Sequence, residues 1–168
     1  MKQRFIYWTA VGFAFATFAG TILHFLYDWT GGNILVASFS GINESTWEHM
    51  KLLFWPMLVF SVIQYFFFRE EANYWQIKLT GILVGLLLIP VLFYTYNGAL
   101  GKSPDWINIA IFYVSAAAAY FLEYRLLTNG CKTSIPPWIS VAMISLIGIL
   151  FIVFTFHPPS LPIFQSQV

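Results

Sequence analysis

The chain has 168 residues, of which 59% are hydrophobic and 20% aromatic, and its formal net charge is +1. Charged residues make up only 9% of it, whereas a soluble domain carries about 25%. This composition excludes a soluble globular domain, and the small net charge provides no basic surface for nucleic acid. The single cysteine, Cys131, excludes an internal disulfide. We expect one transmembrane domain over residues 1–168, with the lipid bilayer as its surroundings.

Long uncharged segments indicate where the chain crosses the membrane. They are 23, 17, 23, 17 and 36 residues long and cover 5–27, 52–68, 79–101, 106–122 and 133–168. A helix needs about 20 mostly apolar residues to span the hydrocarbon core. We therefore predict an all-α membrane bundle of five transmembrane helices, at 5–27, 47–68, 74–97, 104–126 and 137–156.

Two helix starts carry local signals. Ser45, followed three residues later by Glu48, forms a capping-box pattern at the start of the second helix. Ser103 followed by Pro104 predicts an N-cap with proline at the first position of the fourth helix.

The connection between the first two helices, residues 28–46, is long for a helical bundle. Its apolar stretch ILVASF is too short to cross a membrane, and Gly31, Gly32 and Gly41 offer turns on either side. We predict either a re-entrant hairpin or a segment that lies in the membrane interface.

The distribution of Lys and Arg predicts the orientation. One side of the predicted bundle carries six of these residues and the other side carries two, Lys51 and Lys102. The six are Lys2, Arg4, Arg69, Lys78, Arg125 and Lys132. By the positive-inside rule, the N-terminus is expected in the cytoplasm and the C-terminus outside, in a multi-pass protein of the cell membrane.

This topology places all three histidines, His24, His49 and His157, near the outer interface. Ionisable groups at such positions are costly and mark functional sites. A His–Glu–His set drawn from helices one, two and five would supply three nitrogen or oxygen ligands and leave one coordination position open, as catalytic zinc requires. We therefore expect the three histidines to bind a divalent metal, with zinc favoured.

The segment NESTWEH at 43–49 supplies the candidate catalytic groups. Glu48 or Glu44 is the expected general base, and Ser45 is expected to polarise the substrate. Five further residues near the outer interface are expected to contact the substrate, namely Asn43, Asp28, Trp47, Tyr94 and Asn97.

Each of these residues also has a purely structural interpretation. Glu48 can cap the second helix and complement its dipole. His49 can pair with Glu44, and His24 with Asp28 or a backbone carbonyl. His157, next to two prolines, can simply face solvent.

Three segments resemble signature blocks of a family of small bacterial integral membrane proteins to which no function is assigned. They are HFLYDW at 24–29, NESTWEHMKLLFWP at 43–56 and HPPSLPIF at 157–164. The resemblance implies a similar helical bundle but no particular reaction. Ser45 and His49 also resemble, more weakly, the Ser-x-x-x-His pair of membrane hydrolases of the alkaline ceramidase and adiponectin-receptor type. This chain has fewer helices than those hydrolases and no late His-x-x-x-His pair.

Three functions are compatible with these observations. The first is a metal-dependent hydrolase of a lipid or amide-like substrate, with its polar pocket outside the cytoplasm. The second is a protein that binds or transports a small solute or protons through Glu44, Glu48, His24 and Asn43. The third is an accessory membrane subunit without catalysis.

The charge distribution predicts the location of the C-terminus. A reporter fused after Val168 should be active only if it functions outside the cytoplasm, because the side with six basic residues is retained inside. Paired fusions to reporters that require opposite compartments would measure this. Activity of the cytoplasm-dependent reporter at Val168 would reverse the orientation.

Overall fold

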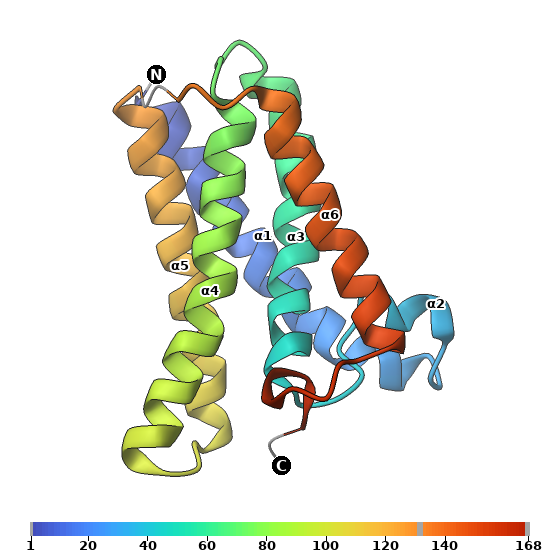
Figure 1. Cartoon of the computed structure of the whole chain (residues 1–168). Helices are drawn as coiled ribbons and strands as arrows, with labels where there is room; N and C mark the ends of the chain where they lie inside the picture. Colours follow the sequence, from blue (N-terminus) through green and yellow to red (C-terminus); the bar gives the residue numbers. More distant parts are fainter. Residues whose placement is uncertain (1, 131–132, 167–168) are drawn as a thin grey trace.

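The computed structural model describes residues 2–130 and 133–166, so Cys131 and Lys132 lie outside the described residues. Five long helices and two short ones follow one another along the chain (Figure 1). The long helices are α1 (Lys2–Trp29), α3 (Thr46–Phe68), α4 (Tyr74–Leu100), α5 (Asp105–Thr128) and α6 (Pro137–Phe156). The short ones are α2 (Ile34–Ala37) and the 3-10 helix η1 (Pro162–Phe164). The five-helix prediction is confirmed.

In the described part of the chain, five helices are long and apolar enough to cross a membrane, and they are the five long helices named above. Each of them exposes large apolar side chains, for example Phe18, Phe66, Leu87, Phe121 and Leu146. In water this much exposed apolar surface would drive association, whereas lipid chains solvate it without cost. The chain is a multi-pass membrane protein.

Helix α3 is the centre of the bundle. It packs against α1, α4, α5, α6 and η1, and Leu53, Phe54 and Met57 on it are fully buried. Helix α6 packs on α3 and α4, while α1 packs on α3 and α5. Helix α1 runs obliquely across the bundle, so that its C-terminal end diverges from α5 (Figure 1).

The end of the bundle at which α1 ends and α3 begins is termed the loop end. Gly31 and Gly32 make the turn after α1 with φ of 66° and 78°, values that favour glycine. Asn33 then caps α2 by accepting the Leu35 N–H at 2.9 Å. Helix α2 stays at the loop end beside the end of α6 and does not return between the long helices (Figure 1). This placement fits the interfacial alternative for residues 28–46.

The local predictions at two helix starts need correction. Helix α5 begins at Asp105, with Pro104 as the N-cap and no side-chain cap. The Ser103 hydroxyl instead donates to Asn108 Oδ1 at 2.7 Å. Half of the capping box forms, because Ser45 Oγ accepts the Glu48 N–H at 3.3 Å. The Glu48 carboxylate does not complete the box, since it turns to partners outside the first turn of α3.

A buried ion pair joins α4 and α5 in the half of the bundle away from the loop end. Lys78 Nζ lies 2.5 Å from Glu123 Oε2, and both side chains are at most 2% exposed. The Lys78 ammonium also lies 5.6 and 5.8 Å from the ring centroids of Tyr74 and Tyr120. A Cβ at Gly81 would lie 2.5 Å from the Glu123 side chain. Glycine at this position therefore lets α4 approach the Glu123 carboxylate.

Removal of one member of this pair should destabilise the bundle. Lys78→Met leaves the Glu123 carboxylate buried without its cation, so the free energy of unfolding should fall by about 3–5 kcal/mol. The double variant Lys78→Met/Glu123→Leu removes both charges and should recover most of that loss. Thermal unfolding of both purified variants in detergent measures the effect. Equal losses in the single and double variants would contradict a role for the ion pair.

Candidate functional site

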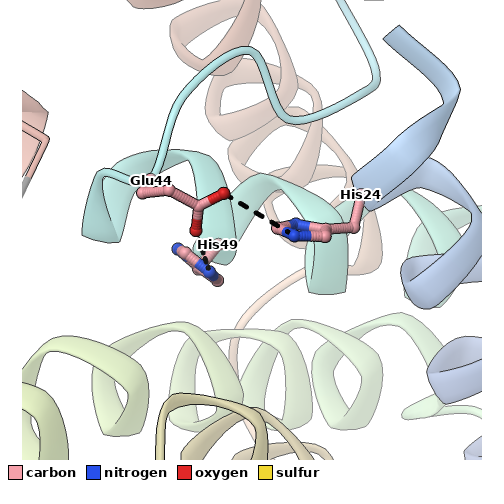
Figure 2. A group of neighbouring side chains, drawn as sticks. All are labelled: His24, Glu44 and His49. Carbon is pink, nitrogen blue, oxygen red and sulfur yellow. Dashed lines mark ion pairs between the residues drawn. The ribbon is translucent and has the colours of Figure 1, made fainter. Parts of the chain in front are cut away.

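His24, Glu44 and His49 meet at the loop end (Figure 2). His24 Nε2 lies 3.7 Å from Glu44 Oε1, and His49 Nε2 lies 3.5 Å from Glu44 Oε2. One carboxylate therefore bridges two imidazoles that belong to different helices. We refer to these three residues as the His–Glu–His cluster.

The local sequence holds each member in place. His49 lies in the first turn of α3, and His24 lies in α1 just over one turn before its end. Glu44 belongs to the tight turn between them, in which Asn43 Oδ1 accepts the Ser45 N–H at 2.9 Å. Because Ser45 caps α3, the same few residues fix both the start of the helix and the carboxylate beside it.

The hydrogen bonding of His49 defines its tautomer. Its Nδ1 lies 2.9 Å from the Ser45 carbonyl oxygen, which can only accept, so Nδ1 carries the proton. In the neutral imidazole, Nε2 is then an acceptor. That nitrogen faces the Glu44 carboxylate, which is also an acceptor. The arrangement is favourable when a metal cation or a second imidazole proton lies between them.

The cluster geometry fits a metal ion. The three candidate ligand atoms lie within 4.8 Å of one another. Ligand atoms around tetrahedral zinc are about 3.4 Å apart, given bonds of about 2.0–2.1 Å. His24 and His49 lie at similar distances, 3.7 and 3.5 Å, from the two different oxygens of the Glu44 carboxylate. The His49 Nδ1–H bond to a backbone carbonyl is also the usual support for a metal-binding histidine.

A cavity of about 550 Å³ opens beside the cluster. His24, Glu44 and His49 form part of its wall, and α4 and α5 form the opposite side. Its apolar floor consists of Leu52, Ile89, Ile111 and Phe112, all of them buried. The volume falls within the range of about 300–1,000 Å³ that is typical of small-molecule sites.

Across the cavity from the cluster, three polar residues order the connection between α4 and α5. Asn97 Oδ1 accepts the Ser103 N–H at 2.7 Å, and the Ser103 hydroxyl donates to Asn108 Oδ1. All three line the cavity. The acceptor role of the Asn108 oxygen leaves its amide N–H groups available as donors to a ligand.

Glu48 lies in a separate, buried network. Its Oε2 is 2.6 Å from Lys51 Nζ and accepts the Ile42 N–H at 3.1 Å. The Lys51 ammonium also donates to the Ala37 carbonyl and to the Thr155 hydroxyl, each at 2.8 Å. Glu48 and Lys51 thus tie the loop that carries Glu44 to both α3 and α6.

The structure distributes the other predicted site residues over the loop end. Asn97 lines the cavity, and Asp28 lies with His24, Asn43 and Glu44 around a smaller hollow of about 160 Å³. Trp47 instead packs against Phe151, Phe154 and Phe164. Tyr94 is exposed and stands outside the residues that line the cavity.

His157 does not join the cluster. It is the exposed C-cap residue of α6, and its backbone N–H donates to the Val153 carbonyl at 2.9 Å. Among the described residues, the potential metal ligands that lie close together are His24, Glu44 and His49, and His157 is not one of them. The third residue of the cluster therefore comes from the loop and not from the fifth long helix.

Sequence reasoning missed Lys51 and Asn108. Lys51 was counted only as a topogenic charge, although it lies two residues after His49 in an otherwise apolar stretch, MKLLF. Asn108 is a single amide among apolar residues in DWINIAIF. A polar side chain on a membrane-spanning helix is itself a signal, because lipid provides it with no partner.

A family model described as "Family of unknown function (DUF6512)" matches residues 1–168. The chain belongs to this family. The match confirms the resemblance of the chain to an uncharacterised family. No curated protein and no solved structure matches the chain.

The buried network predicts that Lys51 holds the loop. Lys51→Met leaves the Glu48 carboxylate unpaired and releases the Ala37 carbonyl, so residues 30–45 should become more susceptible to proteolysis. Limited proteolysis with mass spectrometry measures this. Lys102→Met is the matched control, because Lys102 is exposed and its replacement should leave the digestion pattern unchanged.

Proposed function

We propose that this chain is a membrane metalloenzyme in which His24, Glu44 and His49 bind a divalent ion, with zinc favoured. The observation that carries the proposal is the position of the cluster: three potential ligands from separate segments converge on the wall of a cavity. Two histidines and one carboxylate are the ligand set of several hydrolytic zinc sites, and they leave a fourth position for water.

The proposed reaction is hydrolysis of an ester or amide. A bound metal lowers the pKa of a coordinated water to about 7 and so supplies a nucleophile at neutral pH. In the hydrolysis, the oxygen of water would bond to the carbonyl carbon as the C–O or C–N bond breaks, and a proton of water would pass to the leaving alcohol or amine. No oxidant or reductant is required.

The residues of the chain have distinct roles in this proposal. His24, Glu44 and His49 hold the ion, and the Ser45 carbonyl orients the imidazole of His49. The Asn108 amide lines the other side of the cavity, and its proposed role is to donate to the substrate carbonyl. Glu48 acts indirectly, since its carboxylate is engaged with Lys51 and the loop.

The proposed setting is the cell membrane, with the loop end outside the cytoplasm. The six-to-two distribution of Lys and Arg between the two sides supports this orientation. The cluster would then face the extracytoplasmic side.

Replacement of either histidine should abolish metal binding. His24→Gln and His49→Gln each remove one of three ligands, so the purified variants should lose stoichiometric zinc. Elemental analysis of protein purified in mild detergent without chelator measures this.

His157→Gln is the matched control, because His157 lies outside the cluster and should be replaceable without loss of metal. Wild-type protein that is metal-free and does not take up zinc or manganese on titration would contradict the proposal. That result would favour the binding of a small solute or protons.

A further inference from the structure

The cavity beside the cluster reaches the side surface of the bundle. Seven of its lining residues are exposed. Glu44, Lys102 and Asp105 lie at the loop end, whereas Thr21 and Phe25 on α1 and Ile109 and Tyr113 on α5 lie along the side of the bundle. Phe25, Ile109 and Tyr113 are 45%, 59% and 40% exposed. The cavity therefore reaches the surface both at the loop end and along the side between α1 and α5. The two helices diverge toward this end (Figure 1).

The depth of the side opening places its deepest part, at Thr21 and Tyr113, in lipid. Thr21 and Tyr113 each lie eight residues from the loop end of their helix, about 12 Å at 1.5 Å per residue. Helix α1 has 28 residues and α5 has 24, so they are about 42 and 36 Å long and exceed a hydrocarbon core of about 30 Å. A position about 12 Å from either helix end is inside that core.

The interior of the cavity is suited to a molecule with two unlike ends. Leu52, Ile89 and Phe112 form a buried apolar floor, and polar groups line the part toward the loop end, with the His–Glu–His cluster on one side and Asn108 on the other. A hydrocarbon chain on the floor would place a neighbouring carbonyl group near these polar groups.

We propose that the cavity binds the long acyl chain of a bilayer lipid, which enters sideways between α1 and α5. This inference names the substrate class of the proposed hydrolase. It rests on that proposal only for the hydrolysis of the bound lipid, not for its binding. Occupation of the cavity by an acyl chain does not require a metal. The two proposals therefore fail separately.

Photo-crosslinking in liposomes tests the inference. The probes are a phosphatidylethanolamine and a free fatty acid, each with a diazirine in its acyl chain, applied to the full-length protein in separate experiments. Lipids that merely surround the protein reach only exposed residues such as Val114. Crosslinks at the buried floor residues Ile89 and Phe112 are expected from a chain inside the cavity, and the two probes distinguish esterified from free chains.

Two variants at the opening have matched controls. Thr21→Trp narrows the opening and should abolish labelling of the floor, whereas Ala14→Trp, exposed on the same face of α1 two turns away, should leave it intact. Ile109→Trp and Val114→Trp form a second such pair on α5. Labelling of exposed residues serves as the internal reference for correctly folded protein in each sample.

The outcomes separate the two proposals. Floor labelling that is retained in His49→Gln or with chelator, together with absent metal, supports the acyl-chain site while the metal proposal fails. Crosslinks confined to exposed residues, with both probes, would overturn the acyl-chain site. Floor labelling that persists in both Thr21→Trp and Ile109→Trp would overturn the sideways route.

Discussion

The buried ion pair between Glu48 and Lys51 is the interaction on which the loop end depends. The Lys51 side chain is fully buried and that of Glu48 is 3% exposed. Burial of an ion in a protein costs about several kcal/mol unless partners compensate its charge. The compensation comes from the Ile42 N–H, the Ala37 carbonyl and the Thr155 hydroxyl. These partners belong to the loop, α2 and α6. The loop conformation that carries Glu44 is therefore coupled to the neutralisation of two buried charges.

Helix geometry allows this network and the cluster to share one turn of α3. Neighbouring residues on a helix point about 100° apart, so Glu48 faces the loop and α6 while His49 faces α1. Ser45 connects the two sides, since its hydroxyl caps the helix and its carbonyl orients His49. A substitution in the Glu48–Lys51 network should consequently shift the residues of the proposed metal site, even though Glu48 does not belong to the cluster.

The membrane explains why a polar site and an apolar cavity lie next to each other. Polar and charged groups at the ends of spanning helices keep access to water or to backbone partners, whereas most lining residues deeper in the helices are apolar. The oblique course of α1 separates its end from α5 and leaves the cavity between them (Figure 1). The opposite half of the bundle is closed by the Lys78–Glu123 pair and by the close approach of α4 at Gly81. The helices therefore pack closely in the half away from the loop end, whereas at the loop end a cavity remains among α1, α3, α4 and α5.

The sequence by itself determined the five helices, because runs of uncharged residues long enough to cross a bilayer have few other structures available to them. It also identified His24, Glu44 and His49 as candidates, since charged and ionisable residues are rare in this chain. Only the tertiary structure decided which of them meet. Glu44 and Glu48 are four residues apart and were equivalent candidates for the base, but the packing of α6 and the position of Lys51 engage Glu48 elsewhere. His157 and Trp47 were assigned to the site from their shared side of the membrane, and a shared side fixes depth but not the direction of a side chain. The cavity, its opening to lipid and the role of Asn108 depend on how α1, α4 and α5 cross, which no local pattern encodes.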